Sequence, residues 1–467
     1  MVQRPNKRRN AHGSKSGSRL AAVAMRFLLF MGSYSFHFQL STRDQSQNAR
    51  SYLEGLTTAN LTKNMERMAE RNPKADYQAL QQFMTDSPWS AREVMDHVAQ
   101  DANALIGDAQ GTVLIIDESG IVKKGKNSVG VARQWIGNVG KVENGQVAVY
   151  GALANGSNYC LEDSRLYLPE VWTSDKKRLD KAKVPEAERT FKTKETLALE
   201  IVAHARRLGL KFAWVDADAG YGKSLGFTLA LEQAGETFVV DIHKDQSIYL
   251  EEPQVEVPAY SGRGRKPEKP KANPKPLRVD DLVLVQPENA WEKIAVREGT
   301  KGMIEYEYIF SRVWVYSEEH GTIRQWHLII RRDIETKSDY KYSFSNAPAN
   351  TAKQLLAYIQ AQRYWVERSF EEGKQNCGMA DYQHRKWQSW HHHMALVMMA
   401  LLFMMMEKIE NQDKTPLLTG RDITELLTFY LQEPLTEEQL FKQINARHAR
   451  RRRDIKNAAR RKRKSFG

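Results

Sequence analysis

Two kinds of hydrophobic spacing divide the chain. From about Asp44 to Ile106, apolar residues recur every three or four positions, which is typical of amphipathic helices. The clearest stripe follows a candidate N-cap, Ser90, and comprises Ala91, Val94, Met95, Val98, Ala102 and Leu105. Beyond Gly111, short β-branched runs alternate with helical segments, and this alternation predicts an α/β core.

Two of the predicted strands run into carboxylates. Thr112–Ile116 is a continuous apolar run, as in a strand covered on both faces, and it ends on Asp117. Leu210–Val215 predicts a second strand, which leads into Asp216-Ala-Asp218-Ala-Gly-Tyr-Gly222. Functional sites are commonly built at the rim of such a sheet. A single Asp in that position is about as often a cap or turn residue as a ligand.

The segment from Glu251 to Pro348 interrupts this alternation. Residues 261–276 are rich in Pro and Lys, which predicts an extended or disordered loop that is either a solvated linker or a phosphate-contacting segment. Met303–Tyr316 and Thr322–Arg332 then alternate as paired strands do. Their Trp314 and Trp326 are interpreted as sheet core in preference to base-stacking residues. The whole stretch predicts a β-rich insertion placed before the last helix of the core.

A charged helix follows the insertion. Thr351–Gln360 predicts a helical lead-in, and the next segment runs from Arg363 to Lys374. At about 100° per residue, Arg363, Glu367 and Lys374 fall within roughly 40° of one another on one helix face. Taken alone, this pattern is typical of a solvated face with salt bridges.

The composition favours a polyanionic partner. The chain has 467 residues, with 70 Lys plus Arg against 57 Asp plus Glu and a net charge of +13, a balance that suits nucleic acid before membrane. Its two cysteines, Cys160 and Cys377, argue against a disulfide framework and a Cys-based zinc site, and they fit a reducing cytoplasm.

Both ends of the chain are basic. Arg4–Arg19 is rich in basic residues, Gly and Ser, and the apolar stretch Leu20–Phe36 that follows lacks a convincing signal-peptide cleavage site. Ala446–Lys464 has Asp454 as its only acid, and we expect it to be disordered and to contact phosphates. The apolar run Met394–Met406 is too short for a membrane span and is interpreted as a buried core helix.

These patterns predict a domain organisation in six segments. The segments are a flexible basic arm (1–45), a helical domain that is a candidate for DNA binding (46–106), the first part of the core (107–245), the β-rich insertion (246–348), the second part of the core (349–410) and a C-terminal helical region with a basic tail (411–467).

Three carboxylates together define a kind of chemistry. If the helix carrying Glu367 packs across the rim that holds Asp117 and Asp218, the three acids repel one another unless divalent cations are present. Oxygen ligands at this density suit two Mg²⁺ or Mn²⁺ ions, which promote in-line phosphoryl transfer. Two other patterns are set aside: Gly220-x-Gly222 lacks the rest of a phosphate-binding fingerprint, and His391-His-His393 is interpreted as structural.

The motifs around these acids resemble those of DDE transposases of bacterial insertion sequences. The resemblance rests on Asp117 in its Ile-Asp-Glu-Ser-Gly context, Asp218 in Asp-Ala-Gly-Tyr-Gly, the segment Tyr342–Pro348, and the spacing Arg363-x3-Glu367-x6-Lys374, which is similar to the Tyr-Arg-Glu-Lys signature group. It covers roughly residues 46–410. The resemblance implies an RNase H-like core, α/β in class, interrupted by the β-rich insertion.

The resemblance also implies roles for single residues. Asp117, Asp218 and Glu367 would hold two Mg²⁺ (or Mn²⁺) ions, and Arg363 and Lys374 would contact the DNA backbone near the cut. Lys123 and Lys124, just downstream of Asp117, are further candidate DNA contacts. The substrate would be double-stranded DNA at the element ends and at the target, held by a homodimer in a synaptic complex in the bacterial cytoplasm.

Several alternatives remain open at this point. Gln360 stands where the signature Tyr is expected, which puts a hairpin step in doubt. Glu371 and Glu372 compete with Glu367 as ligand, and Asp216 competes with Asp218. A catalytically silent DNA-binding regulator with the same fold is the second functional hypothesis. A glycosidase with paired carboxylates is the third, which the basic composition disfavours.

Overall fold

The computed structural model describes residues 20–59, 62–72, 75–260, 262–264, 268–299, 302–432 and 435–464, and side chains in the last helix as far as residue 460. The basic arm expected at Arg4–Arg19 lies outside these residues, as do positions 261 and 265–267 of the Pro- and Lys-rich loop. The chain divides into two compact units. The first is Met1–Trp89, Gln375–Gln383 and Met406–Gly467, and the second is Ser90–Lys374 and His384–Met405.

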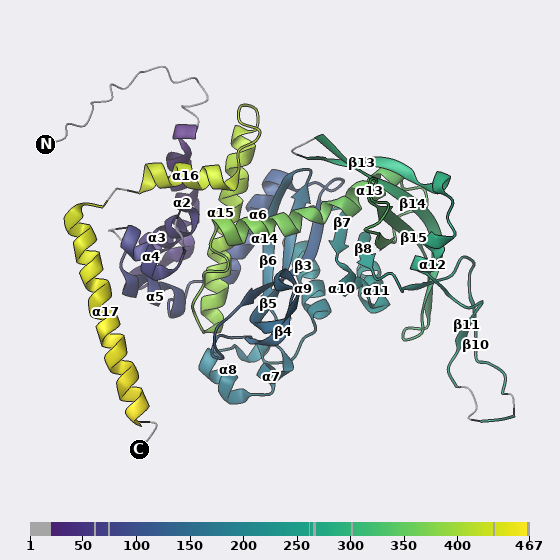
Figure 1. The fold of residues 1–467 in the computed structure, drawn as a ribbon, viewed down its shortest axis with the longest axis horizontal. Coiled ribbons are helices and arrows are strands. Elements are labelled where there is room, and N and C mark those ends of the chain that lie inside the picture. Colours follow the sequence, from purple (N-terminus) through teal and green to yellow (C-terminus); the bar gives the residue numbers. More distant parts are fainter. Residues whose placement is uncertain are drawn as a thin grey trace. The chain divides into compact units, whose positions relative to one another are not determined.

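A ten-stranded mixed sheet forms the centre of the second unit (Figure 1). Its strands are β3 (Val113–Val122), β4 (Ala132–Ile136), β5 (Lys141–Asn155), β6 (Asn158–Leu166), β7 (Trp214–Ala217), β8 (Phe238–Ile242), β13 (Glu292–Gly299), β14 (Gly302–Ser317), β15 (Thr322–Arg332) and β16 (Lys341–Ser345). Their order is β13-β14-β15-β16-β8-β7-β3-β5-β4, and β6 pairs with β5. Strands β3, β7 and β8 run parallel, and the other pairings are antiparallel.

The strand predicted at Thr112–Ile116 is longer than expected. Strand β3 continues through Asp117 to Val122, because it pairs with β5 along its whole length, from Val113↔Ala154 to Val122↔Gly145. Asp117 therefore lies inside a strand and not at its end. The second strand is also displaced toward the C-terminus, since β7 begins at Trp214 and includes Asp216.

The β-rich stretch joins the main sheet instead of forming a separate layer. Strand β16 pairs with β8, and β13, β14 and β15 continue the sheet outward from there. The predicted pairing of two long strands is confirmed as β14 with β15. Trp326 is 1% exposed, and its Nε1 donates a hydrogen bond to Glu232 at 2.9 Å, so it belongs to the core.

Smaller elements complete this region. Two-stranded ladders join β9 (Ser247–Ile248) to β12 (Leu277–Arg278) and β10 (Gln254–Glu256) to β11 (Lys271–Asn273). They are followed by α12 (Val279–Leu284) and the 3-10 turn η4 (Glu288–Ala290).

Helix α6 (Ala91–Ile106) confirms the predicted N-cap. The Ser90 hydroxyl accepts a hydrogen bond from the Glu93 amide at 3.2 Å. The predicted stripe is correct except at its end, because Leu105 is 44% exposed and Ile106 is buried in its place. The helix packs on β5 and β6, and it belongs to the second unit and not to a domain spanning 46–106.

The remaining helices of the second unit lie between its strands and after the last one. They are η2 (Gly137–Val139), α7 (Glu170–Thr173), α8 (Lys176–Ala182), η3 (Glu186–Glu188), α9 (Lys194–Arg207), α10 (Ala219–Gly222), α11 (Leu225–Gln233), α13 (Lys353–Gln362), the greater part of α14 (Tyr364–Asn376) and most of α15 (Trp387–Asn411).

Helix α15 is the one helix among the described residues that is long and apolar enough to cross a membrane, and 83% of its most apolar window is buried. This is the environment of a core helix, as the sequence indicated. His392 and His393 are buried in it, and burial lowers the pKa of His391 to about 4. Cys160 and Cys377 are buried, and no disulfide joins them.

The first unit is mainly helical. It contains α2 (Val23–Tyr34), η1 (Ser35–Phe38), β1 (Gln39–Leu40), β2 (Arg43–Asp44), α3 (Ser46–Thr57), α4 (Met65–Arg71), α5 (Tyr77–Thr85), α16 (Gly420–Leu431) and α17 (Glu437–Lys464). Helix α2 buries Phe27 and Phe30, and its Arg26 pairs with Glu407 at 2.6 Å. This part of the expected flexible arm is therefore folded.

The expectation of a disordered C-terminal tail is wrong. Helix α17 continues to Lys464, because Arg, Lys, Ala, Gln and Glu are strong helix formers and dominate its sequence. Arg447 and Arg450 pair with Glu70 and Glu66 of α4 at 3.5 and 3.0 Å, respectively.

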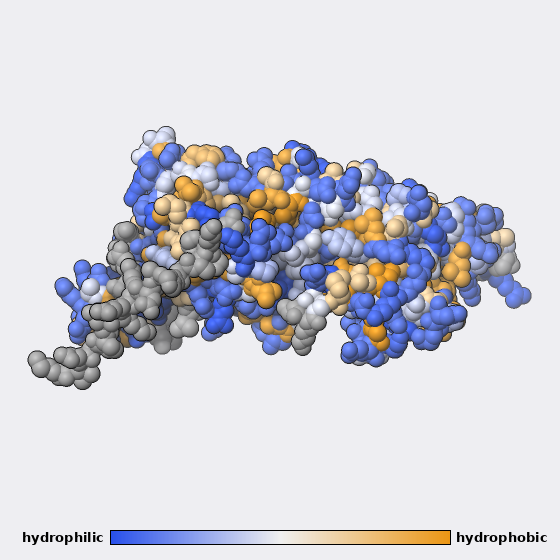
Figure 2. Space-filling view, turned by 90° about the horizontal axis from the view of Figure 1, so that it is seen from above, coloured by the Kyte–Doolittle hydropathy of each residue, from blue (hydrophilic) through white to orange (hydrophobic). Residues whose placement is uncertain are grey.

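Hydrophilic residues predominate on the molecular face shown in Figure 2, where hydrophobic residues form separated patches.

Candidate active site

Three adjacent parallel strands each bring an aspartate to one level of the sheet. The register pairs Ile116 with Ala217, and Ala217 with Val240. The next residues along these strands are Asp117, Asp218 and Asp241. The sequence predicted that the first two would be neighbours. Asp241 is an addition that only the pairing of β7 with β8 reveals.

Asp218 caps helix α10. Its Oδ1 accepts hydrogen bonds from the amides of Gly220 at 2.9 Å and Tyr221 at 3.4 Å. Asp218 is therefore a helix cap, which was one of the two roles that the sequence left open. Its Oδ2 takes no part in the cap. A Cβ on Gly222 would lie 1.9 Å from the carbonyl oxygen of Asp241, so glycine is needed for α10 to approach β8 this closely.

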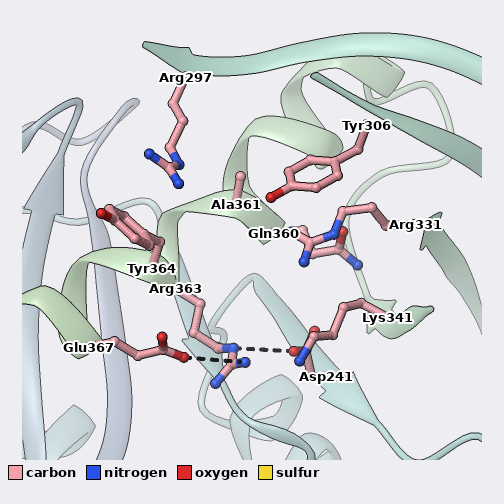
Figure 3. A pocket seen from close by; sticks show the side chains of 10 residues that line it. All are labelled: Asp241, Arg297, Tyr306, Arg331, Lys341, Gln360, Ala361, Arg363, Tyr364 and Glu367. Carbon is pink, nitrogen blue, oxygen red and sulfur yellow. Dashed lines mark ion pairs between the residues drawn. The ribbon is translucent and has the colours of Figure 1, made fainter. Parts of the chain in front are cut away.

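Arg363 lies between Asp241 and Glu367 and pairs with both (Figure 3). It occupies the junction between α13 and α14, and its Nε is 3.2 Å from Oδ2 of Asp241. Its two terminal nitrogens lie 3.8 Å from Glu367 Oε1 and 3.9 Å from Asp117 Oδ2. Burial alone would lower the pKa of Arg363, but the surrounding acids outweigh it and raise the pKa, so the guanidinium stays charged.

The electrostatics show that Asp117, Asp218 and Glu367 are neighbours. Burial, followed by the charge of Asp218, raises the pKa of Asp117 to about 8, and Glu367 adds to this rise. Arg363 and a hydrogen bond from the Glu118 amide act in the opposite direction. Acids that are far apart in the sequence are therefore within electrostatic reach of one another. In the metal-free protein, burial and these acidic neighbours favour the protonated form of Asp117.

The cations that the sequence predicted as DNA contacts differ in their distance from the acids. Burial lowers the pKa of Lys374, and Asp117 opposes this effect, so the ammonium is within electrostatic reach of that carboxylate. Lys123 and Lys124 follow the end of β3, six and seven residues beyond Asp117. At the rise of a strand, Lys123 is about 20 Å away. The structure brings Arg363 and Lys374 to the acids, and it places Lys123 and Lys124 elsewhere.

Of the rival carboxylates, Glu371 and Glu372 have partners outside the cluster, whereas Asp216 lies within electrostatic reach of Asp117, Asp218 and Arg363. Glu371 pairs with Arg368, and Glu372 accepts a hydrogen bond from the Tyr159 hydroxyl at 3.2 Å. Asp216 is 1% exposed, and burial followed by the charge of Asp241 raises its pKa well above the ordinary value. Because side chains two apart share a face, Asp216 lies one pleat deeper than Asp218.

A buried hydrogen-bond chain supports the cluster from behind. Gln360 Nε2 donates to the Ser343 hydroxyl at 2.6 Å, and that hydroxyl donates to Asp241 Oδ1 at 2.5 Å. Gln360 thus directs its amide into the sheet at the position where the signature Tyr is expected. The sequence analysis missed Asp241, although a charged residue inside the apolar run Phe238–Ile242 was a usable signal.

The donor set fits a hard divalent cation in its chemistry, because every acid in it offers carboxylate oxygens. Its geometry is that of acids compensated by an arginine. Within the described ranges, no three His, Cys, Asp or Glu side chains are close enough together to form a ready metal site. In this structure the acids surround the guanidinium of Arg363. Their carboxylate oxygens are also suitable ligands for a metal ion.

Comparisons with known proteins define the class. Residues 35–303, more than half of the chain, match the DDE superfamily endonuclease family, and the chain belongs to that family. It is also 25% identical over 309 residues to a probable transposase for insertion sequence element IS701 from Microchaete diplosiphon. That similarity covers 66% of this chain and 68% of the relative.

Proposed function

We propose that the protein is a DNA transposase that cleaves the ends of a mobile element and joins the 3′-hydroxyls to target DNA. The carrying observation is that Asp218, at the N-cap of α10, and Glu367, in α14, both lie within electrostatic reach of Asp117 in β3. Membership of the DDE endonuclease family and the similarity to an insertion-sequence transposase support the same reaction.

The strand order supports an RNase H-like core. The sequence β6-β5-β3-β7-β8 consists of antiparallel hairpins followed by parallel strands, with β9 to β16 inserted between the second acid and Glu367. The arrangement of Arg363, Glu367 and Lys374 supports membership of the Tyr-Arg-Glu-Lys group. Gln360 departs from that signature.

Asp117, Asp218 and Glu367 would hold two Mg²⁺ or Mn²⁺ ions. Bound there, the ions would activate the attacking oxygen and stabilise the leaving one. The amides of Gly220 and Tyr221 fix the orientation of Asp218. Arg363 balances the acids in the metal-free protein and is positioned to pair with a DNA phosphate near Glu367. Lys374 adds a second cation on the same helix.

The partner in this proposal is double-stranded DNA, bound by a homodimer in the bacterial cytoplasm. The net charge of +13 supports it, as does helix α17, which carries exposed cations such as Arg451, Arg452 and Arg453. Lys123 and Lys124, distant from the acids, would contact DNA outside the cut. These contacts do not depend on base sequence.

The test uses a supercoiled plasmid that carries the DNA ends flanking this gene. With Mg²⁺, we expect the wild type to nick and join these ends. Asp117→Asn, Asp218→Asn and Glu367→Gln should each reduce cleavage on the order of 10³-fold, while a mobility-shift assay shows retained binding. Asp180→Asn, at a surface pair with Arg189 (2.7 Å), is the matched control.

Cleavage that survives in one of these variants would remove that residue from the site. Wild-type protein that binds the ends but never cuts them, with Mg²⁺ or with Mn²⁺, would instead identify a catalytically silent regulator.

A further inference from the structure

A second group of cations lines a cavity that Asp241, Arg363 and Glu367 of the acid site also line. The cavity has a volume of about 170 Å³, and the group consists of Arg297 from β13, Arg331 from β15 and Lys341 from β16. Figure 3 shows their side chains with Tyr306, Tyr364, Arg363 and Glu367 around the same cavity. All three cations come from the inserted strands, and the sequence analysis assigned none of them.

None of these three cations forms an ion pair with an acid in the described part of the chain. Other cations in the same strands do: Lys293 pairs with Glu305 at 2.7 Å, and Arg332 pairs with Glu307 at 2.7 Å. Around the cavity, four cations face two acids, Asp241 and Glu367. The lining therefore carries two more positive than negative charges, and both acids pair with Arg363, not with Arg297, Arg331 or Lys341.

The register makes this arrangement costly without a ligand. Arg331 and Lys341 are direct cross-strand partners, and like charges in that position destabilise a sheet. A local arrangement that costs stability is expected where a site is built for a ligand. An anion between the two side chains would turn their repulsion into attraction.

Aromatic rings hold two of the cations in place. The Arg297 guanidinium lies 3.8 Å from the centre of the Tyr364 ring, and that of Arg331 lies 4.2 Å from the centre of the Tyr306 ring. Stacking leaves the guanidinium edge, with its N–H donors, available for an acceptor. A planar donor edge of this kind recognises phosphate oxygens well.

We propose that Arg297, Arg331 and Lys341 form a binding subsite for a backbone phosphate of the DNA strand that passes Glu367. The proposal deepens the proposed function, since it rests on DNA as the substrate. The chemistry of the subsite selects a phosphodiester, and it carries no information about base sequence. The inserted strands therefore contribute directly to substrate binding.

The experiment measures binding in EDTA, so it does not depend on cleavage. Anisotropy of a labelled duplex carrying an element end is titrated with salt for the wild type, the double variant Arg331→Gln/Lys341→Gln, and Lys293→Gln as a control on a neighbouring strand. Loss of one phosphate contact should reduce the slope of log K against log salt by about 0.9. The control should keep the wild-type slope.

A second arm separates this contact from general charge loss. Single methylphosphonate linkages are placed along the strand, and one of them should weaken the wild type without further weakening the double variant. The charge-retaining Arg331→Lys should keep most of the slope. The thermal midpoint of the double variant, free of DNA, should stay equal or rise, because a like-charge pair is removed.

Three results would overturn the proposal. The first is an unchanged salt slope in the double variant, and the second is the same methylphosphonate profile in the wild type and the double variant. The third is a wild type whose thermal midpoint is raised by inorganic phosphate while the double variant binds DNA as the wild type does, which would indicate a site for a free anion. An unchanged salt slope in the double variant with normal nicking by the wild type would overturn this subsite alone. A reduced slope in the double variant with a wild type that never nicks the ends would instead overturn the transposase assignment.

Discussion

The Nε of Arg363 lies 3.2 Å from Oδ2 of Asp241, which is closer than it lies to either Asp117 or Glu367. Asp241 in turn accepts a hydrogen bond from Ser343, and Ser343 accepts one from Gln360. The cation at the centre of the acid cluster is therefore positioned by a residue outside the proposed catalytic triad. This relationship makes the cluster testable one contact at a time.

Asp241→Asn should weaken the hold on Arg363 while keeping an acceptor for Ser343. Residues that support a metal site in this way typically change affinity or activity by about 10- to 100-fold. We expect a loss of that size in the cleavage rate, together with a changed Mn²⁺ dissociation constant measured by calorimetry. Ser343→Ala, which removes the hydrogen bond to Asp241 and the acceptor of Gln360 but no charge, should have the smaller effect. Equal effects of both variants would contradict a role through charge.

Arg363→Gln should destabilise the metal-free protein. It leaves Asp117, Asp241 and Glu367 without their shared cation, and breaking a buried ion pair costs on the order of 3 kcal/mol. The thermal midpoint in EDTA should fall, and Mg²⁺ or Mn²⁺ should restore more stability than it adds to the wild type. Arg421→Gln, at an exposed pair with Glu425, should change little. A metal-independent midpoint would contradict the prediction.

The stability of the metal-free protein should depend on the protonation of Asp117. Its folded pKa of about 8 lies above the ordinary value of 3.8, so the folded state binds the proton more tightly than the unfolded state does. This contribution is fully present below about pH 4 and is lost as the pH rises through 8. In EDTA, the thermal midpoint of the wild type, measured relative to that of Asp117→Asn, should therefore decrease as the pH is raised from 5 to 9. A constant difference would show that the carboxyl titrates normally.

Gly222→Ala should disrupt the approach of α10 to β8. The new Cβ would lie 1.9 Å from the Asp241 carbonyl oxygen, and backbone cannot yield as a flexible side chain can. Overpacking of this kind costs on the order of 3 kcal/mol, measured by denaturant unfolding. Gly137→Ala, which meets nothing within 4 Å, is the matched control. Tolerance of alanine at position 222 would show that α10 can move away from the strand.

The local patterns of the sequence determined the elements and the chemistry of their acids. Hydrophobic spacing predicted α6, the pairing of β14 with β15 and the buried α15, because each depends on residues close together in the chain. It also identified Asp117, Asp218 and Glu367 by their contexts. It did not predict that β3 continues past Asp117, since that extension depends on hydrogen bonds to the distant strand β5.

Only the tertiary structure decided which side chains surround the acids. Asp241 reaches the cluster because β8 pairs with β7, and Arg331 and Lys341 face each other because β15 pairs with β16. These contacts join segments far apart in the chain, and no local spacing specifies the register between them. The sequence alone therefore predicted Asp117, Asp218, Glu367 and Arg363. Strand pairing added Asp241 to them and brought together Arg331 and Lys341, which remain available for a ligand.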